Sequence, residues 1–109
     1  MSDISTKQAF IRAKAVDGRV KWSRHALGKL GAEIATVRDV ESALQRAELI
    51  EDYPHLHRHL PDCLVLVFVS ARNPMHCVVA LDEDTNFVLV VTVYRPLEKE
   101  WNDDWRTRR

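Results

Sequence analysis

His25 is the first residue whose type and position suit acid–base chemistry. Ser23 is expected to cap a short helix, which places His25 in the first helical turn. The positive end of a helix dipole favours a neutral imidazole, and a neutral imidazole is a usable general base near pH 7. The same spacing also fits an exposed histidine at a helix start that has no chemical role.

His76 is the second candidate, because it opens an apolar run with the pattern of a β-strand. On a later run, strand alternation puts Thr92 and Tyr94 on one face, and the same period adds Val88 and Val90 to that face. If the two strands align, His76, Thr92 and Tyr94 form a polar patch at one end of a sheet. Register is not fixed by sequence, so a half-buried structural histidine beside a strand-end tyrosine is the alternative.

Three further histidines alternate at His55, His57 and His59. In an extended segment their rings point the same way, which is a geometry that can hold a metal ion. The further ligands that a metallo-hydrolase needs are not evident, so we expect no metal and no cofactor. A metal-dependent hydrolase built on these histidines stays open as a third function.

Two tryptophans, Trp101 and Trp105, stand four residues apart near an arginine-rich end. On a helix their indoles would share one face. They can anchor the tail to the core, or they can stack on nucleobases beside cations.

The elements that must position these residues begin with three helices. Residues 6–17 carry an apolar stripe at helical spacing, with Ser5 and Gln8 as an expected capping box. Ser23 is expected to cap the second helix and Thr36 the third.

Strands follow the helices. An extended piece is expected at 20–22, and strands are expected at 49–53, 63–70, 75–82 and 87–95. The short connections between consecutive strands predict antiparallel hairpins. The expected fold is α+β, with N-terminal helices packed on a three- to four-stranded antiparallel sheet.

Composition excludes several classes of protein. The 109 residues carry 16 Lys+Arg against 16 Asp+Glu, and 46% of them are hydrophobic. That is too apolar for a disordered tail, and the length predicts one domain over residues 1–109. No signal peptide or membrane span is visible. Cys63 and Cys77 lie in apolar runs, so we expect buried thiols in a cytoplasmic protein.

The order of short motifs is similar to a small bacterial family known as domain of unknown function 4258, over residues 20–109. In chain order the motifs are Ser23-x-His25-Ala26, Ile34, Asp39-Val40, Ala43-Leu44, Ile50-Glu51-x-Tyr53-Pro54, Asn73-Pro74-x-His76-x-Val78-Val79, Val91-Thr92-Val93-Tyr94-x-Pro96 and Trp101. That family is thought to resemble the RelE/BrnT-like toxins of toxin–antitoxin systems. The resemblance implies a RelE-like or barnase-like fold, RNA cleavage without metal, and a cognate antitoxin as protein partner.

Metal-free RNA cleavage uses the 2′-hydroxyl as nucleophile and needs a base, an acid and cations around the phosphate. The resemblance makes His25, His76 and Tyr94 the catalytic candidates. Together with the cations of the N-terminal half, it gives five RNA-binding candidates: Lys21, Arg24, Lys29, Thr92 and Arg95.

The chain departs from the family pattern between residues 27 and 33. Where the family usually has two arginines, this sequence has Lys29 and Glu33. Lys29 can meet a phosphate as a point charge, whereas Glu33 cannot. The alternative function is therefore a non-catalytic protein-binding module of the same fold, for which a homodimer is one allowed assembly.

Overall fold

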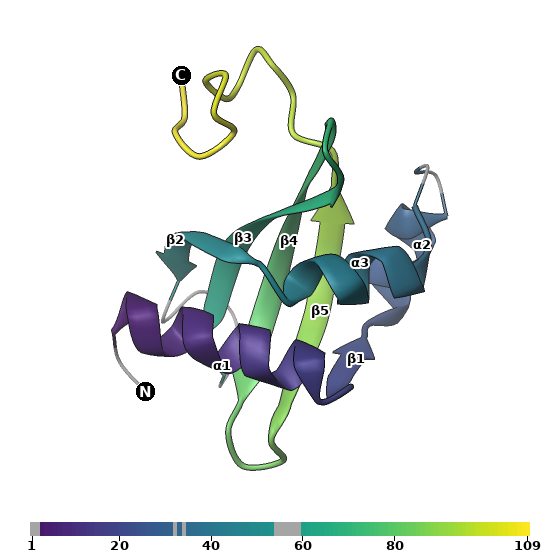
Figure 1. Cartoon of the computed structure of the whole chain (residues 1–109), viewed down its shortest axis with the longest axis vertical. Coiled ribbons are helices and arrows are strands. Elements are labelled where there is room, and N and C mark those ends of the chain that lie inside the picture. The colour runs from purple at the N-terminus through teal and green to yellow at the C-terminus, as the bar shows by residue number, and fades with distance from the viewer. Residues whose placement is uncertain (1–2, 32, 34, 54–59) are drawn as a thin grey trace.

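The computed structural model describes residues 3–31, 33, 35–53 and 60–109, which form three helices and five strands (Figure 1). In chain order these are α1 (Ile4–Val16), β1 (Val20–Trp22), α2 (Arg24–Leu30), α3 (Val37–Leu44), β2 (Glu48–Tyr53), β3 (Asp62–Ser70), β4 (Asn73–Asp82) and β5 (Phe87–Tyr94). The expected α+β class is confirmed.

The strands form one mixed sheet in the order β1-β5-β4-β3-β2. Strands β2 to β5 pair antiparallel, as the short connections predict, but β1 pairs in parallel with β5. The prediction of a purely antiparallel sheet of three or four strands is therefore wrong at this edge. β1 has only three residues and its partner lies far along the chain, so no local pattern reports the pairing.

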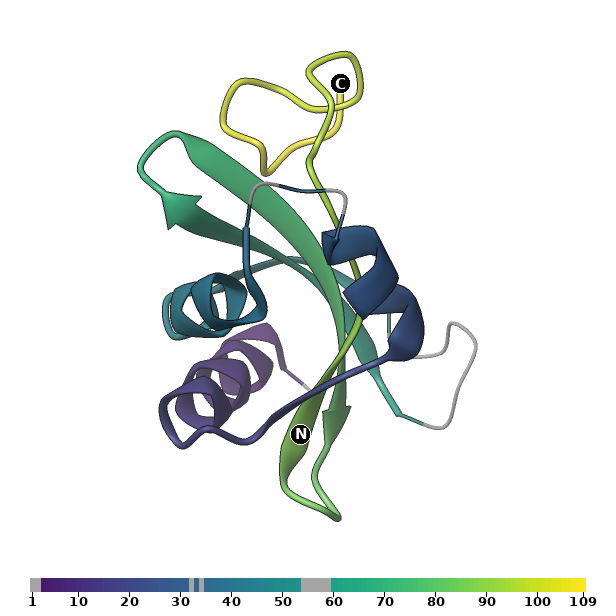
Figure 2. The same cartoon turned by 90° about the vertical axis from the view of Figure 1, so that its right-hand side faces the viewer.

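The main apolar core lies between the helices and one face of the sheet. Figure 2 shows α1 and α3 side by side on this face, with α2 toward the β1 and β5 end of the sheet. Ile11 of α1 and Leu44 of α3 are fully buried here, against strand residues that include Cys77 and Val79. Each buried aliphatic side chain contributes about 1.5–3 kcal/mol, so this core holds the helices on the sheet.

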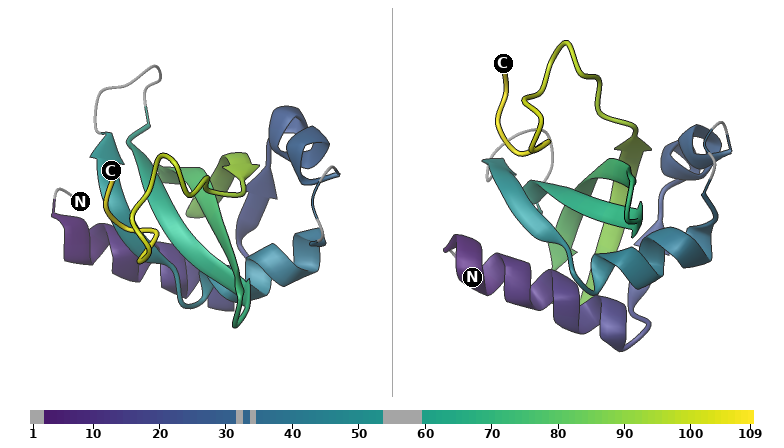
Figure 3. Two further views of the ribbon diagram at one scale, coloured as in Figure 1. Left: turned by 90° about the horizontal axis from the view of Figure 1, so that it is seen from above. Right: turned by 45° about the horizontal axis from the view of Figure 1, so that its top comes forward.

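The opposite face carries Leu64, Leu66 and His76, which are also fully buried. Residues 96–109, here called the C-terminal strap, fold over one end of the sheet (Figure 3). Trp101 of the strap is only 2% exposed, and its ring centre lies 4.4 Å from that of His76 in an edge-on arrangement. The prediction that a tryptophan anchors the tail is confirmed for Trp101.

The strap does not form the helix on which the two indoles would share a face. Trp101 instead pairs with Arg108 through an isolated antiparallel β-bridge, and the Arg108 guanidinium lies 4.7 Å from the Trp101 ring. Trp105 is half-buried and separate from that contact. The two tryptophans therefore have different surroundings.

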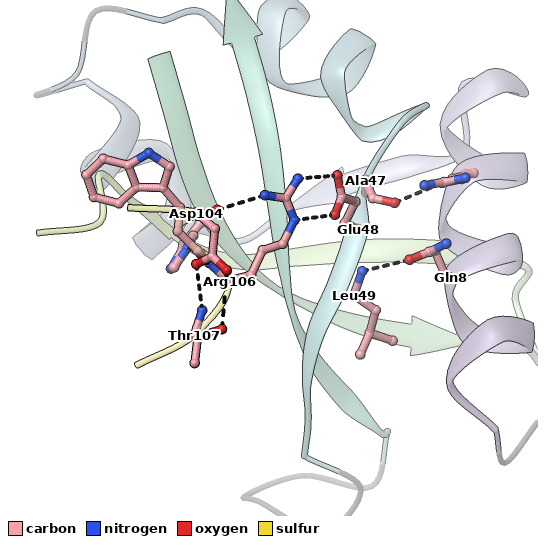
Figure 4. Close-up of polar contacts among 10 residues, drawn as sticks. Gln8, Ala47, Glu48, Leu49, Asp104, Arg106 and Thr107 are labelled. Carbon is pink, nitrogen blue, oxygen red and sulfur yellow. Dashed lines mark hydrogen bonds and ion pairs between the residues drawn. The ribbon is translucent and has the colours of Figure 1, made fainter. Parts of the chain in front are cut away.

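The start of α1 differs from the predicted capping box. Asp3 is the N-cap, and its carboxylate accepts a 2.8 Å hydrogen bond from the Thr6 amide. Gln8, free of a capping role, accepts from the backbone N–H of Leu49 at 2.9 Å and so ties α1 to β2 (Figure 4). Thr36 caps α3 as predicted, in a capping box with Asp39.

A bulge in β5 positions the start of α2. Val78 pairs with Thr92 and Val79 pairs with Val90, so Val91 is an extra residue in β5. The bulge exchanges the two faces of the strand, because the helix-side core takes Val90 and then Val93. Thr92 and Tyr94 consequently lie on the face opposite to that of Val90, and the expectation that they share a face with Val88 and Val90 is wrong.

Ser23 binds to this bulge. Its amide donates to the Val90 carbonyl at 3.0 Å, and its hydroxyl donates to the Val91 carbonyl at 2.8 Å. The same hydroxyl oxygen accepts from the Ala26 amide at 2.9 Å, so Ser23 caps α2 as predicted. One side chain thus starts the helix and fixes it to β5.

We expect Ser23→Ala to lower the free energy of unfolding by about 1–2 kcal/mol, because it removes the helix cap and leaves the Val91 carbonyl without this donor. Urea unfolding measures the change. Ser42→Ala, on the exposed surface of α3, is the matched control and should change stability by less than about 0.5 kcal/mol. Equal effects of the two substitutions would contradict the linking role of Ser23.

Candidate functional site

His25 is held at the surface by Thr92. Its Nε2 atom lies 3.1 Å from the Thr92 hydroxyl oxygen, and the His25 side chain is exposed while Thr92 is half-buried. The cap at Ser23 and the bulge at Val91 bring the two residues together from α2 and β5. Because a hydroxyl both donates and accepts, Thr92 can orient the ring in either neutral tautomer.

His76 lies directly opposite Tyr94 in the β4–β5 register, and Thr92 follows on the same face of β5. The register that the sequence left open therefore places His76, Thr92 and Tyr94 on one face, with His76 as a buried histidine beside the strand-end Tyr94. The His76 ring is fully buried, with its centre 5.5 Å from that of Tyr94. In this arrangement the ring reaches no solvent and packs beneath the strap.

The tautomer of His76 follows from its one hydrogen bond. Nε2 lies 2.8 Å from the Trp105 carbonyl, which can only accept, so Nε2 carries the proton. Nδ1 is then a buried acceptor with no hydrogen-bond partner in the structure. Burial lowers the pKa of His76 below its ordinary value, although the Trp105 carbonyl and the charge of Glu51 act in the opposite direction. His76 is thus a neutral ring that anchors the strap.

Tyr94 is the β5 residue that pairs with His76. Its side chain is half-buried, and burial raises the pKa of its phenol above the ordinary value. The hydroxyl therefore keeps its proton at neutral pH and can act as a hydrogen-bond donor. Tyr94 is the last residue of β5 and follows Thr92 by two residues on the same face.

The five predicted RNA-binding residues do not all gather at this place. Arg24 and Lys29 are exposed on α2, and Lys29 follows His25 by four residues, so it lies on the same side of the helix. Lys21 instead lies 4.2 Å from the centre of the Phe87 ring, near the opposite end of β5. At about 3.3 Å per residue, that end is roughly 16 Å from Thr92.

Arg95 lies just past the end of β5. Its guanidinium donates to the Asn73 side chain at 2.6 Å, and it lies 3.9 Å from the Glu33 carboxylate. The Glu33 carboxylate is thus beside a cation. An exposed pair at this distance contributes little to stability, about 0–1 kcal/mol, so Arg95 can exchange Glu33 for another anion.

The sequence analysis missed the carboxylates of β2 that hold the strap. Arg106 makes two hydrogen bonds to Glu48, at 2.7 and 2.8 Å (Figure 4), and Arg108 makes two to Glu51, at 2.8 and 3.1 Å. The Arg108 contact is the main cause that lowers the pKa of Glu51. The sequence pattern that could have predicted these ion pairs was the pair of glutamates in an edge strand together with the arginine-rich end of the chain.

Both thiols are buried, as predicted. Burial is the main cause that raises the pKa of Cys63 to about 12, and it raises the pKa of Cys77 to about 12 as well. Neither thiol forms an appreciable fraction of thiolate near pH 7, which a cysteine nucleophile requires.

The structure describes only some of the residues that could hold a metal ion. Among the residues that the structure describes, no group of three histidine, cysteine or acidic side chains is placed to hold a metal ion. His55, His57 and His59 lie outside the described residues. In the described part of the chain, no helix is long and apolar enough to cross a membrane.

A family model matches most of the chain. The model of the family described as Domain of unknown function (DUF4258) matches residues 22–95, and the chain belongs to this family. The match includes α2 and all of β2 to β5, whereas α1 and the C-terminal strap lie outside it. The resemblance was expected to extend to residue 109. No curated protein and no solved structure matches the chain.

We expect the free energy of unfolding to fall as the pH is lowered from about 6.5 toward 5. The folded-state pKa of His76 lies below its ordinary value of about 6.5, so the unfolded chain binds more protons in this window and stability rises with pH. Urea unfolding at several pH values measures the slope. Glu51 and Arg108 are the charged groups that face His76, and both stay ionised throughout this window.

His76→Phe should remove this slope, since the phenyl ring fills a similar space and does not titrate. The matched control is His25→Gln, which changes an exposed histidine and should keep the slope. A His76→Phe variant that still loses stability between pH 6.5 and pH 5 would show that another group is responsible.

Proposed function

We propose that this chain is a metal-independent endoribonuclease whose acid–base group is His25. The observation that carries the proposal is the exposed imidazole held 3.1 Å from the Thr92 hydroxyl, with the cations of α2 beside it. Among the described residues, His25 is the one histidine that reaches solvent. An RNA strand lying over the start of α2 would meet this ring first.

In the proposed reaction His25 is the base and water is the acid. His25 takes the proton of the ribose 2′-hydroxyl, and the 2′-oxygen then attacks the adjacent phosphorus. The bond from phosphorus to the 5′-oxygen breaks, and this oxygen takes a proton from water. The products are a 2′,3′-cyclic phosphate and a free 5′-hydroxyl.

The remaining residues have supporting roles in this proposal. Thr92 orients the imidazole, and Lys29 and Arg24 offset the negative charge that develops on the phosphate. Arg95 can leave its exposed contact with Glu33 to hold a neighbouring phosphate. The Tyr94 phenol can donate a hydrogen bond to the RNA. His76 has no direct role in this version, because its ring is buried beneath Trp101.

The proposal extends the family resemblance to RelE/BrnT-like toxins. Under this proposal the α+β fold is that of a RelE-like toxin, and an antitoxin would cover the surface around His25. The chain has zero formal net charge, so binding of RNA depends on the local cations of α2 and the end of β5 rather than on an overall positive field.

A non-catalytic protein-binding module is the second candidate. It is favoured by the burial of His76, which leaves one accessible imidazole among the described residues where two-histidine cleavage uses two. Lys29 and Glu33, in place of the family's two arginines, favour it as well. Under this alternative the same surface binds a protein and leaves RNA intact.

We expect His25→Ala to lower RNA-cleavage activity at least 100-fold, which is the usual contribution of a positioned general base. Purified chain is incubated with a short unstructured RNA in the presence of EDTA, and the appearance of 2′,3′-cyclic phosphate ends is followed. Thr92→Val should cost about 5-fold, since it removes one hydrogen bond of about 1 kcal/mol. Arg38→Ala, which changes an exposed residue of α3, is the matched control.

Two results would contradict the proposal. Folded wild type that leaves RNA intact, in the absence and in the presence of EDTA, would favour the binding module. Cleavage that proceeds equally in wild type and His25→Ala would place the chemistry elsewhere.

A further inference from the structure

A pocket of about 360 Å³ lies beyond the end of β5, where the strap begins. Its volume falls in the range of about 300–1,000 Å³ that is usual for small-molecule sites. The residues that line it come from the β3–β4 turn, the start of β4, the position just past β5 and the strap. They are Arg72, Pro74, Arg95, Pro96, Leu97, Glu98 and Trp105.

The pocket combines an apolar wall with two cations. Pro74, Pro96 and Leu97 supply aliphatic surface, and Arg72 and Arg95 supply two exposed guanidinium groups. Glu98 is the one carboxylate among the lining residues, so the lining carries a net charge of +1. A guanidinium binds phosphate through two parallel hydrogen bonds, so this lining favours an anionic ligand.

Trp105 adds an aromatic surface, and its backbone is held in an unusual conformation. Its φ angle is +61°, in the left-handed region that bulky residues rarely adopt. The Trp105 carbonyl accepts from His76 and its amide donates to Asn102 at 2.9 Å. Buried His76 therefore fixes the backbone of Trp105 while the side chain lines the pocket. Strain of this kind concentrates at functional sites.

We propose that this pocket binds one nucleotide of single-stranded RNA, with its phosphate between Arg72 and Arg95 and its base on the Trp105 indole. An indole beside arginines is the arrangement that binds bases and backbone of single strands together. An acidic peptide would match the charge but would leave the aromatic and aliphatic walls without a flat partner.

This inference rests on the proposed ribonuclease function and gives that site a neighbouring subsite. Arg95 follows Thr92 by three residues, which is about 10 Å along a strand. The pocket would hold a nucleotide next to the one that meets His25. Pro96, Leu97, Glu98 and Trp105 lie outside the span matched by the family, so four of the seven lining residues come from this chain's strap.

The test uses a tetranucleotide with a 5′-phosphate in which every ribose is 2′-O-methylated. This RNA cannot be cleaved by attack of its 2′-oxygen, so binding is measured apart from catalysis. We expect Trp105→Ala to weaken binding about 5- to 150-fold, which corresponds to the loss of one stacked base. Isothermal titration calorimetry with the full chain gives the dissociation constants.

Arg72 provides a readout that is independent of the Trp105 substitution. Arg72 is exposed, and its substitution by alanine should weaken binding and flatten the logarithmic salt dependence by about 0.7, as expected for one lost phosphate contact to a single strand. Arg38→Ala, an exposed arginine of α3 that is outside the pocket, should leave the affinity and its salt dependence unchanged.

Several outcomes would overturn the inference. Unchanged affinity in both Trp105→Ala and Arg72→Ala would do so, and so would equal binding of inorganic phosphate or of a tetraglutamate peptide. His25→Ala separates this inference from the proposed function. If that variant binds the methylated RNA normally while wild type fails to cut ordinary RNA, the pocket stands and the catalytic proposal fails.

Discussion

The hydroxyl of Ser23 makes the contact on which the candidate site depends. It donates to the carbonyl of the extra residue Val91 in β5 and accepts from the first turn of α2. The bulge turns Thr92 away from the helix-side core, and the cap brings His25 over it. Without the bulge, strand alternation would give Thr92 to the apolar core, and the exposed imidazole would have no partner on the sheet.

The strap provides the second constraint, and it is held mainly by an apolar anchor. Trp101 is buried against His76, and such an aromatic contact contributes more than the exposed ion pairs of Arg106 and Arg108. His76 then has two functions in the fold: its ring supports Trp101, and its Nε2–H fixes the backbone of Trp105. A single buried histidine therefore links the sheet to the wall of the pocket.

Local sequence patterns predicted two helix caps and the strand segments. They did not predict the contacts between segments that are far apart in the chain. The caps at Ser23 and Thr36 and the strand runs were readable because each depends on neighbours in the sequence. The parallel edge strand and the bulge at Val91 depend on pairing between distant segments, which no local pattern reports. The face that His76 shares with Thr92 and Tyr94 depends on strand register, and its burial depends on Trp101 from the far end of the chain, so the sequence could predict neither.

In the complex that we propose, one RNA strand runs from the start of α2, past the end of β5, to the strap. Mapping the binding of the methylated tetranucleotide by NMR chemical shifts tests it most directly. We expect shifts at His25 and Thr92 and at the indole N–H of Trp105, and none in the edge strand β2. Shifts confined to β2, or at only one end of the predicted path, would contradict it.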